Sequence, residues 1–164
     1  MSKVESFAPS IDDRSRILIL GSMPGVKSIK EQQYYANPRN HFWKIIYSIF
    51  STPLDQEYND RIFFIREKGI ALWDVISTCY RVGSLDSNIE NETVNDFRGL
   101  IDNYPNLKLV VFNGTKAFEV YKKRVGFDQP SIDYKLLPST SPANTMKFEA
   151  KLKEWGTIVD YLTI

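Results

Sequence analysis

Four short apolar runs constrain the fold of this chain more than any other feature of its sequence. They cover residues 17–20, 70–73, 107–112 and 135–137. Continuous apolar runs of this length are typical of strands that are buried on both faces, as the strands of parallel sheets are. We therefore expect a parallel sheet of four strands with helices packed on each side.

The segments between these runs carry apolar residues at helical spacing. The predicted helices cover residues 41–50, 56–68, 91–103, 115–124 and 144–162. Gly99 interrupts the third helix, and Thr115 is expected to cap the fourth. Strands that alternate with helices form right-handed βαβ units. The sequence thus predicts an α/β fold, a three-layer α/β/α sandwich around a central, mostly parallel four-stranded sheet, in a single domain of residues 1–164.

Composition excludes several kinds of site. With Cys79 as its single cysteine and His41 as its single histidine, the chain has no disulfide and no cluster of His and Cys ligands for a metal. It also lacks the glycine-rich motifs of dinucleotide and phosphate-loop sites. We therefore expect no metal and no cofactor. No signal peptide or membrane-spanning stretch is evident, which predicts a cytoplasmic protein.

Small, polar loops follow the first and last predicted strands. Residues 21–25 read Gly-Ser-Met-Pro-Gly, and residues 137–144 read Leu-Pro-Ser-Thr-Ser-Pro-Ala-Asn. A third segment, residues 34–43, is rich in aromatic and amide side chains. Open α/β sheets bind ligands beyond the carboxyl ends of their strands, so the first and last loops should face one site.

These three segments together resemble the uracil-DNA glycosylase superfamily. Its members place a Gly-x-Asp/Asn-Pro loop after the first strand and a Pro-Ser loop after the last. The segment at 35–43 resembles the mismatch-specific branch, and the whole chain resembles the hypoxanthine-DNA glycosylases most. This resemblance implies a monofunctional, metal-free DNA glycosylase that flips a deaminated base out of DNA and hydrolyses its N-glycosidic bond. The expected partner is single- or double-stranded DNA, and the expected oligomeric state is a monomer.

The first loop departs from the superfamily in one chemically important position. Met23 stands where many members carry a catalytic Asp or Asn, and a thioether cannot accept a proton or orient water. The resemblance to the hypoxanthine branch places the catalytic amide at Asn40 instead. An amide carbonyl can hold a water beside the positive charge that develops on the sugar. Asn40 is equally well explained as the N-cap of the helix that begins at His41, and both roles are compatible.

Five residues are candidates for binding the flipped base. By resemblance Tyr35 is the stacking aromatic, and at least one of Tyr34 and Tyr35 should face the cleft. Asp74, at the end of the second strand, can accept a hydrogen bond from a base when it is ionised. It is also explained as a helix N-cap, just as Asn113 is explained as part of a turn with Gly114. The remaining candidates are Ser22 and Met23, through their backbone N–H groups.

The Pro-Ser loop offers candidate contacts to DNA phosphates. Hydroxyl and backbone N–H groups of Ser139, Thr140 and Ser141 can bind phosphate, although a polar turn has the same composition. Arg39 and Lys147 are the basic residues assigned to the same surface. Lys151 is a further candidate, and Lys153 is expected on a solvated helix face. Leu137 stands where uracil-specific members carry a histidine, which weighs against a uracil-specific enzyme.

Three other functions fit parts of the sequence. A uracil or G:U/T mismatch glycosylase is the alternative within the same class. A catalytically silent DNA-binding protein would be favoured if Asn40 were buried in the core. A small-molecule α/β hydrolase or transferase would be favoured by a closed pocket without a basic rim.

Overall fold

The computed structural model describes residues 3–162, and its centre is a parallel sheet of four strands. The strands run in the order β3 (Ile70–Asp74), β2 (Ile17–Gly21), β6 (Leu109–Asn113) and β7 (Asp133–Leu137). All three pairings between neighbours are parallel. The prediction of a central parallel sheet built from the four apolar runs is confirmed. The expected burial on both faces is wrong for β7, an edge strand on which Asp133 and Leu136 are exposed.

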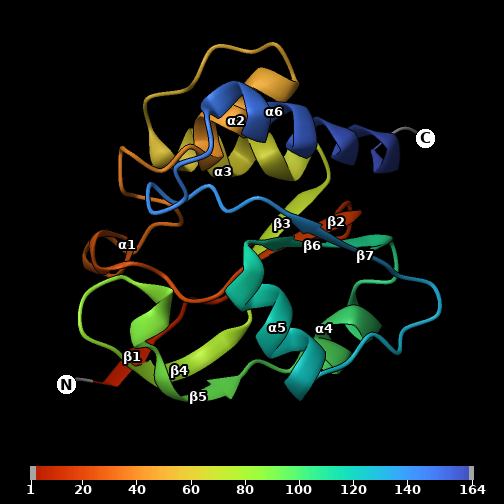
Figure 1. The fold of residues 1–164 in the computed structure, drawn as a ribbon. Coiled ribbons are helices and arrows are strands. Elements are labelled where there is room, and N and C mark those ends of the chain that lie inside the picture. The colour runs from red at the N-terminus through yellow and green to blue at the C-terminus, as the bar shows by residue number, and fades with distance from the viewer. Residues whose placement is uncertain (1–2, 163–164) are drawn as a thin grey trace.

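Helices cover both faces of this sheet (Figure 1). One face packs against α2 (Phe42–Ile49), α3 (Tyr58–Glu67) and α6 (Phe148–Trp155), and the other against α4 (Phe97–Asn103) and α5 (Thr115–Arg124). The alternation of side chains along a strand produces two cores. In β2, Ile17 and Ile19 pack on the α2 side, whereas Leu18 and Leu20 pack on the α5 side. The three-layer α/β/α architecture is therefore as expected.

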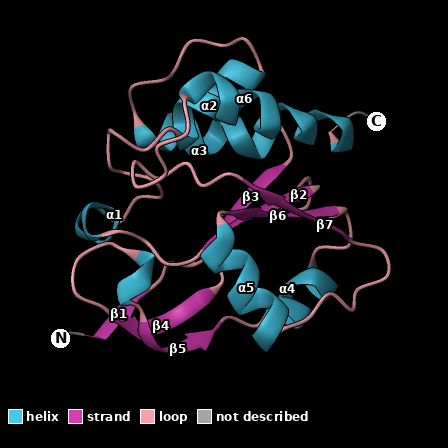
Figure 2. Ribbon diagram, viewed as in Figure 1, coloured by secondary structure: helices cyan, strands magenta, loops and turns pink. Residues whose placement is uncertain are grey.

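A second sheet, which was not predicted, lies beside the first (Figure 2). It contains β1 (Lys3–Glu5), β4 (Ile76–Tyr80) and β5 (Glu90–Val94), paired antiparallel in the order β1-β4-β5. The helix predicted over 91–103 is wrong in its first part, because residues 91–94 pair with β4. The helix begins at Phe97, where the Asp96 carboxylate accepts a hydrogen bond from the Gly99 N–H. A side chain at Gly99 would collide with that carboxylate.

Three features of the helices differ from the expectation. The last helix starts at Phe148 rather than Asn144, because residues 138–147 form a loop that contains a turn, and it continues as the 3-10 helix η2 (Gly156–Tyr161). Thr115 does not cap α5, since the N-cap position is Gly114 with φ of 97°. The short elements α1 (Val26–Glu31) and η1 (Asp86–Asn88) were not predicted. Within residues 3–162, no helix has the length and apolar character needed to cross a membrane.

Candidate active site

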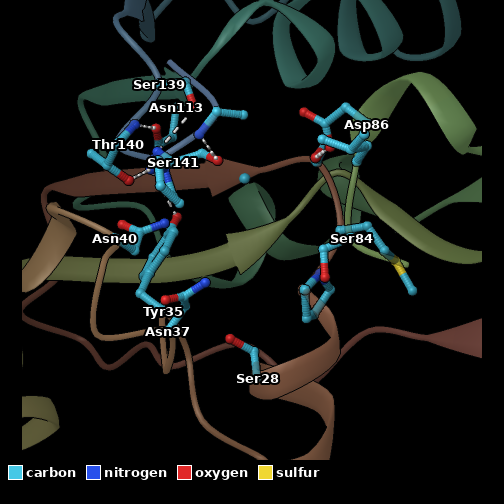
Figure 3. A pocket seen from close by; sticks show the side chains of 18 of the residues that line it. Ser28, Tyr35, Asn37, Asn40, Ser84, Asp86, Asn113, Ser139, Thr140 and Ser141 are labelled. Atoms are coloured by element: carbon cyan, nitrogen blue, oxygen red, sulfur yellow. Dashed lines mark hydrogen bonds between the residues drawn. The ribbon is translucent and has the colours of Figure 1, made fainter. Parts of the chain in front are cut away.

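A pocket of about 660 Å³ lies beyond the carboxyl ends of the parallel strands. Gly21, Asp74 and Asn113, the last residues of β2, β3 and β6, all line it. Its walls come from the loop after β2, the segment 34–40, the Pro-Ser loop after β7 and the connection between β4 and β5. Figure 3 shows Tyr35, Asn40, Thr140 and Ser141 on one side of this space, with Ser84 and Asp86 on the other.

The side-chain amide of Asn113 joins two of these segments, the Pro-Ser loop and the segment 34–40, to the end of β6. Its Oδ1 accepts a hydrogen bond of 2.9 Å from the Thr140 N–H, and its Nδ2 donates to Thr140 Oγ1 at 3.0 Å. The same Nδ2 donates to the Tyr35 hydroxyl at 3.3 Å (Figure 3). The interpretation of Asn113-Gly114 as a turn is also supported, because Gly114 has φ of 97° and a side chain there would press on Ser139.

Thr140 is fully buried, which corrects its assignment as a phosphate contact. Its hydroxyl and its N–H are both bonded to Asn113, and its carbonyl accepts a hydrogen bond of 3.0 Å from the His41 N–H. These bonds fix the Pro-Ser loop to β6 and to the start of α2. Thr140 therefore positions the loop, and its hydroxyl is not open to DNA.

Tyr35 presents an aromatic ring to the pocket. Its ring stacks on Phe42 with centroids 4.0 Å apart and an interplanar angle of 21°. The residue has φ of 55°, an uncommon conformation for a residue with a side chain. Tyr34 also contributes to the pocket lining but is buried, and its hydroxyl donates to the Ala8 carbonyl. The expectation that one of the two tyrosines faces the cleft is confirmed for Tyr35 (Figure 3).

Asn40 lies at the pocket, just before α2. Its Oδ1 accepts a hydrogen bond of 2.9 Å from the Phe42 N–H at the start of that helix. The N-cap position is His41, so the prediction of Asn40 as the N-cap is wrong, although its side chain does bond the first N–H of the helix. A carbonyl oxygen has two lone pairs, which leaves one for a further donor. The side chain is half-buried and lines the pocket, rather than being buried in the core.

Asp74 is a buried carboxyl group in the pocket lining. It is 4% exposed, and its Oδ2 has no hydrogen-bond partner within residues 3–162. A Cβ at Gly21 would lie 2.7 Å from its Oδ1, so glycine is required there. The next element along the chain is β4, not a helix, so the interpretation of Asp74 as a helix cap is wrong.

Burial and the nearby Asp86 carboxylate raise the pKa of Asp74 and Arg81 lowers it, with a net rise to about 7. We expected Asp74 to act only as an ionised hydrogen-bond acceptor. This expectation is revised, because the neutral acid of Asp74 is also populated near neutral pH. The neutral form can donate one hydrogen bond as well as accept others.

This shift gives a pH-dependent stability prediction. The folded protein binds the Asp74 proton more tightly than the unfolded chain, whose pKa is near 3.8. The stabilisation from the neutral acid is thus complete below pH 3.8 and lost as the pH rises through 7. We expect Asp74→Asn to raise the Tm relative to the native protein more at pH 8 than at pH 5. Asp102→Asn, on an exposed helix surface, is the control, and equal Tm differences at both pH values for Asp74→Asn would contradict the prediction.

The loop after β2 is bonded to the connection between β4 and β5. Ser22 Oγ donates to Asp86 Oδ1 at 2.6 Å, and Met23 is buried at the pocket wall. Pro24 and Val26 are bonded to the same connection, through Arg81 and Ser84. The sequence did not predict that the connection between β4 and β5 lines the pocket, because this connection is polar and turn-forming and contains no recognised motif.

The basic candidates divide into exposed and buried groups. Arg39 is exposed at the pocket, and Lys147 is exposed just before α6 but outside the pocket lining. Lys153 is exposed, as expected. Lys151 is fully buried, with Nζ 3.3 Å from His41 Nδ1 and 3.4 Å from the Ser141 carbonyl. The interpretation of Lys151 as a phosphate contact is therefore wrong, because it supports the Pro-Ser loop from below.

Burial lowers the pKa of the Lys151 ammonium. Burial and the charge of Lys151 also lower the pKa of His41, which disfavours its protonated form. Ser139 and Ser141 of the Pro-Ser loop are half-buried and keep donors available at the pocket. The hydroxyl oxygens of Ser139 and Ser141 accept the N–H groups of Ser141 and Ala143, which leaves each O–H free to donate.

Titratable side chains do not gather into a metal site in this part of the molecule. Within residues 3–162, no group of three or more His, Cys, Asp and Glu side chains is placed to hold a metal ion. The pocket instead combines an aromatic ring, amides, hydroxyls and a buried carboxyl group. An aromatic ring can stack on a flat heterocyclic base, and the polar groups beside it can form hydrogen bonds with the edge of that base. Pockets of this kind hold the flipped base in DNA glycosylases.

Comparison with known proteins gives the same class. The family model of the uracil DNA glycosylase superfamily matches residues 8–163. A hypoxanthine DNA glycosylase of Methanosarcina barkeri is 38% identical over 157 residues, covering 94% of this chain and 96% of the relative. A second hypoxanthine DNA glycosylase, from Methanosarcina acetivorans, is 38% identical over 155 residues, covering 93% and 95%.

A solved structure is also similar along its whole length. The solution NMR structure of a candidate uracil DNA glycosylase from Methanosarcina acetivorans superposes with a TM-score of 0.85 at 36% identity, covering 98% of this chain and 99% of that one. The chain belongs to the uracil DNA glycosylase superfamily. The expected enzyme class, a DNA glycosylase that hydrolyses N-glycosidic bonds in DNA, is confirmed.

Proposed function

We propose that this enzyme is a monofunctional glycosylase that removes hypoxanthine from DNA. The observation that carries the proposal is that the amide able to orient water is at Asn40, while the usual catalytic position holds Met23. Met23 occupies the wall where an Asp or Asn is expected, whereas the Asn40 amide lies at the same pocket with a lone pair to spare. The two relatives that are 38% identical, both hypoxanthine DNA glycosylases, support this choice of base.

The flipped base is held by stacking and by contacts to its edge. One face of the Tyr35 ring is covered by Phe42, and the base stacks on the face toward the pocket. Asp74 accepts the N1–H of hypoxanthine from the floor of the pocket when it is ionised, and Asn113 holds the Tyr35 ring in place. Backbone N–H groups of Ser22 and Met23 are proposed to face the departing base.

The reaction needs one positioned water and a set of fixed dipoles. The C1′–N9 bond breaks, and its electron pair leaves with the base, whose negative charge the backbone N–H groups stabilise. The Asn40 carbonyl holds the water that forms the new C–O bond at C1′, and the proton of that water passes to solvent.

The lysines near the pocket are engaged in other contacts. Lys27 at the rim pairs with Glu31 at 3.7 Å, and Lys151 faces the Ser141 carbonyl. No amine nucleophile, and therefore no strand cleavage, is part of the proposal.

DNA is proposed to lie across the rim that carries the Pro-Ser loop. Arg39 and Lys147 supply positive charge, and the free O–H donors of Ser139 and Ser141 bind phosphate oxygens beside the extruded nucleotide. Every group assigned here comes from one chain, so a monomer suffices for the reaction.

The direct test is excision from defined oligonucleotides. Single- and double-stranded substrates carrying hypoxanthine, uracil, xanthine or a thymine mismatch are incubated with enzyme, and abasic sites are cleaved with alkali. We expect hypoxanthine to be removed fastest, with strand breaks only after alkali. Preferential removal of uracil would support the alternative of a uracil or G:U/T mismatch glycosylase, and the absence of abasic sites on every substrate would refute the proposed reaction.

Base choice is tested further by Asp74→Asn. A carboxylate only accepts hydrogen bonds, whereas an amide presents a donor or an acceptor, so the substitution rearranges the contact to the base edge. We expect the ratio of hypoxanthine to uracil excision to change by roughly 5- to 150-fold, as a contact worth ~1–3 kcal/mol implies. Excision of both bases is measured in parallel. An unchanged ratio would remove Asp74 from the recognition site.

A further inference from the structure

A buried arginine lies behind the loop that follows β2. Arg81 comes directly after β4 and is 4% exposed. Its Nη2 donates to the Pro24 carbonyl, whereas its Nε and Nη1 are buried without a hydrogen-bond partner within residues 3–162. No ion pair in the described part of the chain includes Arg81. Burying a cation without a counter-charge costs free energy, so a group of this kind indicates a functional use of its charge.

Arg81 does not line the base pocket, the pocket of about 660 Å³ beyond the parallel strands. It lines a second cavity of about 610 Å³ together with residues of β1 and α1. It is connected to the base pocket through the loop at residues 21–25, whose Pro24 carbonyl it binds. The backbone N–H groups proposed to face the departing base, those of Ser22 and Met23, belong to the same loop. Arg81 can therefore act on a bound base from behind this loop without touching it.

The charge of Arg81 reaches the base pocket. Burial and the charge of Asp86 raise the pKa of Asp74, which lines the base pocket, and the positive charge of Arg81 lowers it. An attraction that favours the carboxylate of Asp74 also favours any other anion that forms beside it. Arg81 thus supplies positive potential at the place proposed for the base.

The proposed reaction forms such an anion. When the C1′–N9 bond breaks, the electron pair and its negative charge leave with the base. The basic residues in the lining of the base pocket, Lys27 and Arg39, are engaged elsewhere. Lys27 pairs with Glu31 at 3.7 Å, and Arg39 is exposed on the side proposed for phosphate. The buried guanidinium is the cation that remains for the departing base.

We propose that Arg81 is a positioning residue whose positive charge, acting from behind the loop at residues 21–25, stabilises the negative charge that develops on the departing base. This inference rests on the proposed glycosylase function. The bond to Pro24 fixes the loop relative to β4, and burial strengthens the attraction because the surroundings have a low dielectric constant. The attraction grows as the base takes up negative charge, so Arg81 favours bond breaking more than base binding.

Three substitutions separate the charge of Arg81 from its hydrogen bond. Arg81→Gln removes the charge but keeps an N–H group that can donate to the Pro24 carbonyl. Arg81→Lys keeps a positive charge at the same place. Arg124→Gln is the matched control, because Arg124 at the end of α5 is exposed and lies outside the lining of both cavities.

The measured quantity is single-turnover excision of hypoxanthine and of 8-azahypoxanthine from otherwise identical duplexes. The additional ring nitrogen of the aza base stabilises its departing anion and leaves the N1–H edge unchanged. We expect Arg81→Gln to slow hypoxanthine excision by about tenfold or more, and to slow excision of the aza base less, so that the ratio of the two rates changes by at least about fivefold. Arg81→Lys and Arg124→Gln should keep the native ratio.

The ratio of the two rates does not depend on the fraction of folded enzyme, so a loss of stability cannot imitate this result. Equal slowing of both substrates by Arg81→Gln would overturn the proposal and leave Arg81 as a support of the loop. Unchanged rates in Arg81→Gln, or a native enzyme that removes both bases equally fast, would overturn it as well, because the departing charge would then need no help from Arg81. A native enzyme that excises neither base would instead refute the glycosylase function itself.

Discussion

Asn40→Ala should slow single-turnover base excision by at least about 100-fold while duplex binding stays nearly unchanged, as expected for the loss of one catalytic dipole. The Asn40 side chain lines the pocket and keeps a lone pair for water, whereas Met23 on the neighbouring wall has no group that can replace it. Rates at saturating enzyme and binding to an uncleavable duplex are the two measurements.

The hydrogen bond from the Phe42 N–H to Asn40 must be separated from the role of Asn40 in the reaction. Alanine removes this bond and destabilises the start of α2 by about 1 kcal/mol. Asn40→Ser keeps a side-chain oxygen that can accept the Phe42 N–H but withdraws the amide from the pocket. We expect it to have a Tm near that of the native protein and the same loss of rate as the alanine variant. Native-like excision by either variant would exclude Asn40 as the catalytic residue.

Tyr35→Ala should slow excision by roughly 5- to 150-fold, the range that corresponds to a base stack worth ~1–3 kcal/mol. Tyr35→Phe should retain most of the native rate, because it keeps the ring stacked on Phe42 and loses a single hydrogen bond of 3.3 Å from Asn113. Excision rates of the two variants are compared under single-turnover conditions.

The backbone conformation of Tyr35 makes this comparison well controlled. Its φ of 55° strains alanine and phenylalanine alike, so backbone strain cancels between the two variants. Thermal unfolding of both shows whether loss of the aromatic stack with Phe42 also lowers stability. Equal rate defects at unchanged stability would assign the direct role to the hydroxyl group instead of the ring.

The parallel sheet and most of its helices were predictable because their signals are local. A strand buried on both faces must be apolar throughout, and β2 and β6 satisfy this condition over nearly their whole lengths. Chain order then places the loops after β2 and β7 at the same edge of the sheet. The antiparallel sheet escaped prediction because β5 is largely exposed and polar, and its pairing with β4 is a tertiary interaction.

Several site properties depend on contacts between distant segments. Thr140 and Lys151 have side chains suited to binding phosphate, yet packing buries both and turns them into supports of the Pro-Ser loop. The protonation of Asp74 likewise depends on its burial against Gly21 and on the charges of Asp86 and Arg81.

The sequence by itself determined the four parallel strands, most of the helices packed on them, the end of the sheet at which the pocket lies and the residue types available there. It could do so because burial on two faces and helical periodicity are properties of neighbouring residues. Only the tertiary structure decided which polar side chains stay open to DNA, and it alone brought the connection between β4 and β5 to the pocket wall. Solvent access and electrostatic environment are set by whichever segments pack together, and residues as far apart as Ser22 and Asp86 meet only in the folded chain.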